Sequence, residues 1–272
     1  MTEPGAGAEG PRRGKLVIVG TGIRPPFQTT FEALFHIEKA DRVFFLLAEE
    51  APTKWIYQRN GSARSLAPLY VEHTNRADVY ESIVEMVLVP VREGLEVCLA
   101  LYGHPGVFVS PSHEALARAR AEGLEASMLP GVSAEDCLFA DLGVDPAESG
   151  CQSYEATDFL IRRRVVDPAV PLVLWQITVI GRAGTTHEIN RSGLAVLAER
   201  LIELHGPDHE VVLYEASPFP VGRPIMDRVL LRDLAEADAT PLSTLYVPPS
   251  RRSPVDRAVL DRLGIEPTRP SG

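Results

Sequence analysis

The sequence has few cysteines and no evident metal ligands. It contains three cysteines, and no two of them form a Cys-x-x-Cys pair. This argues against both a disulfide framework and a zinc site, and no group of His, Asp and Glu has the spacing of metal ligands. Cys98 and Cys137 stand in apolar segments, which predicts that both are buried thiols.

Long apolar segments and an excess of basic residues are also lacking. No apolar run approaches the roughly 20 residues that a membrane span needs, and residues 1–14 lack the apolar centre of a signal peptide. We therefore expect a cytoplasmic protein without a membrane partner. The formal net charge of −10 argues against nucleic acid as a partner. The short basic runs at 162–164 and 251–252 are typical of a solvated helix end and a tail.

Apolar residues are abundant enough for a full core. They make up 45% of the 272 residues, which suits two compact lobes or one large α/β unit. Short apolar runs alternate with helical patterns, which is typical of an α/β protein with a mostly parallel sheet, at least in the first half. We expect a disordered tail at 1–14, an N-terminal α/β lobe at 15–125, a C-terminal α/β lobe at 126–250, and a tail with a short helix at 251–272.

Half of a dinucleotide-binding fingerprint follows the first predicted strand, 15–19, at Gly20-Thr21-Gly22. The third glycine is missing and Pro25-Pro26 follow, and proline cannot supply the N–H groups that hold a pyrophosphate. The pattern therefore argues against a Rossmann site for NAD. It still marks a strand end near a ligand.

Two further glycine loops, 102–108 and 130–136, each follow an apolar run. A helix that begins at Ser110 or Ser112 joins them. Glycine lets the backbone approach a ligand closely, and ligands of such sheets bind at the carboxyl ends of strands. The two loops therefore predict a cofactor site.

A helical pattern runs from Thr74 or Asn75 to Val91. Arg76 and Tyr80 are four residues apart and share one face of this helix. By its spacing alone, Tyr80 would be a core aromatic on an amphipathic helix. Pro90 predicts a kink or an early end.

The sequence contains five longer segments of note: GTGI, YGHPGVFVSPSHEAL, MLPGVSAEDCLFADL, YEATDFLIR and STLYVPP. Together they resemble the tetrapyrrole-methylase superfamily of S-adenosylmethionine (SAM) enzymes. Within it, the chain is most similar to the borosin peptide α-N-methyltransferases, over about residues 15–250. The resemblance implies two α/β lobes with SAM in the cleft between them, S-adenosylhomocysteine as product, and a homodimer.

The resemblance also implies which residues contact SAM. From the residues alone, Gln176 and Tyr214 could instead be core polar groups with internal partners. His104 beside a proline could be only a turn residue. The implied contacts are Tyr102, His104, Val107, Phe108, Ser133, Ala134, Gln176, Tyr214, Ser243 and Thr244.

The catalytic residues of the family fall on Tyr70, Arg76 and Tyr80. An amide nitrogen is a poor nucleophile because its lone pair is delocalised into the carbonyl. We assign Tyr70 as the base, Arg76 as the cation that favours its phenolate or contacts the substrate oxygen, and Tyr80 as a hydrogen-bonding group that orients the amide.

The chain also departs from the fused enzymes of this family, which continue into a clasp region and an apolar core peptide. We therefore expect a split enzyme that methylates a separate precursor peptide. Ala67 stands where those relatives carry tyrosine, and Pro90 interrupts a helix that is continuous in them. Two alternatives stay open: a methylase of a small tetrapyrrole, and a non-catalytic protein that binds SAM or a precursor.

Overall fold

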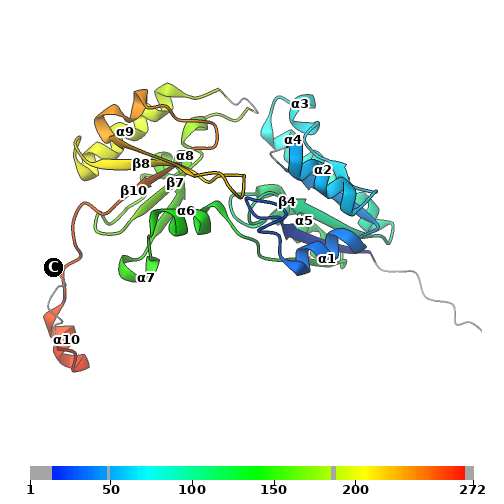
Figure 1. Ribbon diagram of the computed structural model, residues 1–272, viewed down its shortest axis with the longest axis horizontal. Helices are drawn as coiled ribbons and strands as arrows, with labels where there is room; N and C mark the ends of the chain where they lie inside the picture. Colours follow the sequence, from blue (N-terminus) through cyan, green and yellow to red (C-terminus); the bar gives the residue numbers. More distant parts are fainter. Residues whose placement is uncertain (1–13, 48–49, 185–187, 267–272) are drawn as a thin grey trace, which may run out of the picture.

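The computed structural model describes residues 14–47, 50–184 and 188–266, which form two lobes side by side (Figure 1). Each lobe is built on one five-stranded sheet, with the order β3-β2-β4-β1-β5 in the first and β6-β7-β10-β8-β9 in the second. The described residues thus contain two α/β units, one on each sheet. The tail predicted at 1–14 lies outside the described residues except for Gly14.

All strands of the first sheet are parallel. Central strands of such a sheet are buried on both faces, which is why β1, β2 and β4 are nearly continuous apolar runs. Their carboxyl ends lie at one edge, so the loops after β1, β4 and β5 meet there. The strands are β1 (Lys15–Gly20), β2 (Arg42–Leu46), β3 (Arg64–Ser65), β4 (Glu96–Leu101) and β5 (Glu125–Met128).

The boundary between the lobes lies later than the sequence predicts. β5 pairs with β1 from Lys15 to Ile18, so the first lobe extends past residue 125, where we expected its end. The expectation is wrong by a few residues because an apolar run in the sequence does not show which strand it pairs with.

Helices cover both faces of the first sheet. Ala33 and Ile37 of α1 and Ile56 of α2 pack on one face, and α3, α4 and α5 cover the other. The Asn75 side chain caps α4 by accepting a hydrogen bond from the N–H of Ala77 at 2.9 Å. The helices are α1 (Phe31–Lys39), α2 (Glu50–Arg59), α3 (Leu69–Glu72), α4 (Arg76–Arg92) and α5 (Ser110–Ala121).

The sequence predicts that Pro90 kinks α4 or ends it early, but Pro90 does not end the helix. The helix continues through it to Arg92. Pro90 lies in the last turn, so only the final hydrogen bonds of the helix are affected by its missing N–H.

The second sheet is mixed. β6 and β7 are parallel, and the other neighbours pair antiparallel. β9 has no strand pattern in the sequence, because it is an edge strand in which Asp227 and Arg228 break the apolar run. The strands are β6 (Gln152–Glu155), β7 (Leu172–Trp175), β8 (Glu210–Glu215), β9 (Ile225–Leu230) and β10 (Thr244–Val247).

One face of the second sheet packs on α8, α9 and η2, and the other packs on α6. α10 extends away from this lobe (Figure 1). Among the described residues, no helix is both long and apolar enough to cross a bilayer. The helices are α6 (Ala134–Leu142), α7 (Pro146–Ser149), α8 (Ala156–Ile161), η1 (Ile177–Val179), α9 (Arg191–His205), η2 (Leu231–Glu236) and α10 (Arg257–Leu263).

Candidate active site

Three glycines hold the loops at the carboxyl edge of the first sheet in close contact. A Cβ atom on Gly20 would lie 2.3 Å from the carbonyl oxygen of Gly103, and one on Gly131 would lie 2.9 Å from the same oxygen. Both distances are shorter than van der Waals contact, so the loops after β1, β4 and β5 require glycine here. This contact fixes the backbone of the loop that leads from β4 into the site.

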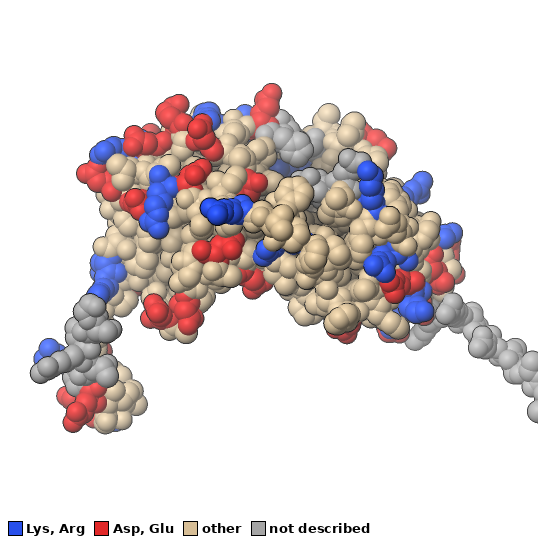
Figure 2. Space-filling view, viewed as in Figure 1, with Lys and Arg blue, Asp and Glu red and all other residues tan. Residues whose placement is uncertain are grey.

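A cavity of about 640 Å³ lies beside this loop and is lined by both lobes. Its volume is within the range typical of small-molecule sites, and a mostly apolar lining with a few polar groups is also typical of them. Uncharged residues dominate the middle of the face in Figure 2, between the charged side chains of the two lobes. The lining residues are Leu46, Leu47, Ala67, Tyr70, Val71, Arg76, Tyr80, Ile83, Leu99, Leu101, Tyr102, Phe108, Val109, Pro111, Gln176 and Leu242.

The three predicted catalytic residues all line this cavity. Tyr70 comes from α3, and Arg76 and Tyr80 come from the first two turns of α4. Two phenols and one guanidinium thus converge on a largely apolar space. Such a group can accept a proton, stabilise an anionic oxygen and orient an amide.

Burial raises the pKa of Tyr70 to about 12, and the neighbouring Tyr80 adds to this effect. Arg76 lowers the pKa of Tyr70, as the sequence analysis expects, but burial outweighs it. Tyr70 is therefore a neutral hydroxyl near pH 7. Ionising it needs a change in its surroundings beyond the presence of Arg76.

The second lobe holds the start of α4 in place. The backbone N–H of Arg76 donates to the carbonyl of Ala183 at 3.1 Å, and Asn75 forms an isolated antiparallel bridge with Gly184. The position of Arg76 therefore depends on both lobes, although nothing in its sequence neighbourhood indicates this.

Three of the predicted cofactor residues line the cavity: Tyr102, Phe108 and Gln176. Phe108 and Gln176 have φ angles of +55° and +57°. This left-handed region is costly for a residue other than glycine, and such strain gathers at functional sites. Phe108 belongs to the first lobe and Gln176 to the second, so strained backbone lies on both sides of the cavity.

His104 and Val107 form the turn between Tyr102 and Phe108 and do not line the cavity. His104 Nδ1 accepts a hydrogen bond from the N–H of Gly106 at 2.9 Å, and the N–H of Val107 donates to the carbonyl of His104 at 3.2 Å. These contacts of His104 are those of a turn residue, which is one of the two roles that the sequence leaves open for it.

The other five predicted cofactor residues lie outside the lining of the cavity. Ser133 caps α6 in a capping box with Asp136. Ala134 is the first residue of α6 and packs against the hydrophobic core. Thr244 of β10 pairs with Tyr214 of β8, and the hydroxyl of Ser243 accepts from the N–H of Thr240 at 2.8 Å.

Tyr214 is a satisfied core residue in this structure. Its side chain is 1% exposed, and its hydroxyl donates to Oδ2 of Asp141 at 2.7 Å. Burial is the largest cause of a raised pKa for Tyr214, and the hydrogen bond to Asp141 raises the pKa further. It therefore remains a hydrogen-bond donor to Asp141 at neutral pH.

Several apolar residues that no sequence motif marks also line the cavity. Leu46 ends β2 and Leu47 follows it, and Val71 and Leu242 lie exposed at the edge of the cavity. They carry no motif, since an apolar residue at a strand end resembles any core residue. Only the pairing order of the strands brings them to this site.

A comparison with protein families matches residues 15–237 to the tetrapyrrole (corrin/porphyrin) methylases. The chain belongs to this family. Its fold is similar to that of two solved methylase structures. The uroporphyrin-III-C-methyltransferase of Thermus thermophilus has a TM-score of 0.62 and 22% identity, covering 94% of this chain and 100% of that one. A cobalt precorrin-4 methyltransferase has a TM-score of 0.62 and 17% identity, covering 86% and 94%. The predicted fold class is confirmed.

Fungal methylases of this family are more similar in sequence. Three of them are each described as a methyltransferase and ribosomally synthesized cyclic peptide precursor, and the chain spans 30% to 63% of their length. The type III borosin protein of Anomoporia bombycina is 43% identical over 94% of this chain and 30% of its own length. The gymnopeptide protein of Gymnopus fusipes is 42% identical over 93% and 61%. The omphalotin A protein of Omphalotus olearius is 42% identical over 94% and 63%.

Proposed function

We propose that this chain is a SAM-dependent α-N-methyltransferase that methylates backbone amides of a separate, ribosomally made precursor peptide. The observation that carries the proposal is the meeting of Tyr70, Arg76 and Tyr80 in one cavity with Tyr102 and Phe108 of the glycine loop. The relatives are described as methyltransferases joined to a peptide precursor, which supports a peptide substrate.

The residues of the cavity fit SAM. Four aromatic rings, from Tyr70, Tyr80, Tyr102 and Phe108, line a space of about 640 Å³, and aromatic faces attract a cation such as a sulfonium. The side-chain amide of Gln176 can hydrogen-bond a polar group. Bound there, SAM supplies an electrophilic methyl group and leaves as S-adenosylhomocysteine.

The protein's own residues deal with the poor nucleophilicity of the amide. Once it has lost its own proton to solvent, Tyr70 accepts the N–H proton on its phenolate oxygen. Arg76 stabilises negative charge on the amide oxygen, and Tyr80 hydrogen-bonds the peptide group to orient it. A cation bound near Tyr70 would favour its phenolate and so offset the effect of burial on its pKa. Holding the amide in line with the methyl group supplies much of the remaining acceleration.

We further propose that the enzyme acts as a homodimer, which the resemblance to the borosin enzymes implies. Ala67 lines the cavity where a tyrosine is expected in the fused relatives. Its small side chain leaves more room for the peptide beside Tyr70.

Mass spectrometry tests the proposal. The protein is incubated with SAM and small peptides encoded beside its gene, and fragmentation locates any added methyl groups. Successive single-methyl additions on backbone nitrogens are expected. Tyr70→Phe should abolish them while calorimetry still detects S-adenosylhomocysteine binding, and Tyr57→Phe, a change at a half-exposed phenol, should act like the wild type.

Two outcomes would count against the proposal. Binding of S-adenosylhomocysteine without methylation of any peptide would favour the small-molecule methylase, and a panel of tetrapyrroles would then be the next substrates. Equal loss of binding and turnover in Tyr70→Phe would make Tyr70 a pocket residue instead of the base.

A further inference from the structure

α3, the four-residue helix that carries Tyr70, has a hollow on each side. Tyr70 and Val71 face the cavity of about 640 Å³. On its other side, Leu69 and Glu72 line a second cavity, an open surface hollow between α3, α4 and the edge of the first sheet. α3 therefore packs against its neighbours over only part of its surface, and dense packing is what normally fixes side chains.

Little else holds α3 in position. Its N-cap residue is Pro68, which forms no side-chain cap. Leu69 is its one buried side chain, at 6% exposure, and Tyr70 is partly buried against the same core, whereas Val71 is 88% exposed. A helix of one turn is not stable by itself, so its position depends on contacts with its neighbours.

A hydrogen bond ties the end of α3 to α4. His73, the C-cap residue of α3, lies with its Nε2 3.0 Å from Oγ of Ser82 in α4. Ser82 is two residues after Tyr80 in the same helix. The bond therefore links the segment that carries the proposed base to the segment that carries the other two proposed catalytic residues.

We propose that His73 and Ser82 are positioning residues: their hydrogen bond holds α3 against α4 and so sets the distance of Tyr70 from Arg76 and Tyr80. Neither residue lines the reaction cavity, and both line the second one. Without the bond, α3 can move toward the second cavity. The inference rests on the proposed function, because it takes Tyr70 as the base.

The kinetic test compares Ser82→Ala with Ser82→Thr, which keeps the hydroxyl. Misplacing a catalytic group by about 1 Å can cost on the order of 100-fold in rate, so Ser82→Ala should lower kcat by at least about tenfold. The Kd for S-adenosylhomocysteine and the Tm should change little, and Ser82→Thr should recover most of kcat. The matched control is Ser250→Ala, which removes a similar bond at 3.1 Å to His205 in the other lobe.

A second readout does not depend on methylation. Tetranitromethane nitrates tyrosines through the phenolate, and peptide mapping resolves Tyr70 from the other tyrosines. Release of α3 would expose Tyr70 and bring its pKa back toward 10. Ser82→Ala should therefore raise the nitration rate of Tyr70 at least about fivefold relative to Tyr57, and Ser250→Ala should not.

The results separate the two proposals. Unchanged kcat together with unchanged nitration of Tyr70 in Ser82→Ala would overturn the positioning role. An equal loss of kcat, cofactor binding and Tm would also overturn it, because the bond would then only stabilise the fold. If the wild type methylates no peptide, the proposed function fails, and nitration still decides whether the bond sets the position of Tyr70.

Discussion

Phe108 of the first lobe and Trp175 of the second pack against each other with tilted rings, whose centroids lie 5.3 Å apart and whose planes are inclined by 37°. Trp175 is 8% exposed, and its indole N–H donates to Oγ of Ser153 at 2.8 Å. It is therefore fixed in the second lobe. Phe108 is 43% exposed and has a strained backbone, so the contact with Trp175 helps to hold its loop in shape.

We predict that Trp175→Leu weakens binding of S-adenosylhomocysteine. Aromatic pairs contribute about 0.5–1.5 kcal/mol beyond buried area, which corresponds to a rise in Kd of roughly 2- to 13-fold. Isothermal titration calorimetry measures it. Phe31→Ala is the control, because Phe31 is 91% exposed on α1. An unchanged Kd in Trp175→Leu would show that the stacking does not organise the cofactor loop.

The contact of Gly20 with Gly103 predicts a loss of stability in Gly20→Ala. The added Cβ would lie 2.3 Å from a carbonyl oxygen that belongs to the backbone, so the loops after β1 and β4 must separate. Overpacking of this kind costs about 1–3 kcal/mol, which denaturant unfolding would detect. Gly61→Ala is the matched control, because its Cβ would meet nothing within 4 Å. Equal stability of the two variants would contradict the prediction.

The raised pKa of Tyr70 predicts how the rate depends on pH. The pKa of Tyr70 is about 12. At any pH below this value, raising the pH by one unit increases the phenolate fraction about tenfold. If Tyr70 is the base, kcat/KM should rise with a slope near one in a logarithmic plot from pH 7 upward. Tyr57→Phe should keep this slope. A flat profile in the wild type would contradict the role of Tyr70 as an ionising base.

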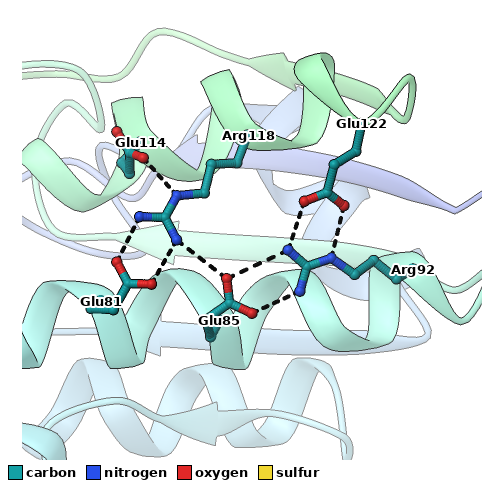
Figure 3. A network of polar contacts seen from close by, with 6 residues as sticks. All are labelled: Glu81, Glu85, Arg92, Glu114, Arg118 and Glu122. Carbon is teal, nitrogen blue, oxygen red and sulfur yellow. Dashed lines mark hydrogen bonds and ion pairs between the residues drawn. The ribbon is translucent and has the colours of Figure 1, made fainter.

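A network of six charged residues joins α4 to α5 on the outside of the first lobe (Figure 3). Arg118 forms a bidentate pair with Glu81 at 2.6 and 2.7 Å, and Arg92 bridges Glu85 and Glu122. Side-chain hydrogen bonds from the arginines lower the pKa of the carboxyls of Glu81, Glu85 and Glu122. The network thus stabilises the fold above their ordinary pKa of 4.5, and this contribution is lost as pH falls through the lowered values.

We predict that Arg118→Met lowers the Tm at pH 7 and low salt, and that the difference from the wild type shrinks in 1 M salt and at acidic pH. Arg59→Met, which removes a single pair with Glu38 at 3.3 Å, is the control and should have a smaller effect because isolated surface pairs contribute little. Calorimetric scans at pH 3 and pH 7 measure both. A loss of Tm that is independent of salt and pH would mean that Arg118 acts through packing alone.

Local patterns made much of the fold predictable. The apolar runs of β1, β2 and β4 and the glycine loops after β1, β4 and β5 lie where the sequence places them. Asn75 is the cap of α4, one of the two residues that the pattern allowed. Cys98 and Cys137 are buried and free. These features depend on a few consecutive residues, so a single chain segment contains the information.

The amino-acid order alone established the class of fold, the glycine loops and, through its resemblance to a family, the candidate catalytic residues. Which of these residues share a cavity depends on the folded chain, because the pairing order of strands and the contact of two lobes are not local properties. Folding places Gln176 at the cavity and Tyr214 in the core, although both are polar residues at the ends of apolar runs. It also raises the pKa of Tyr70, since burial depends on residues far apart in the chain.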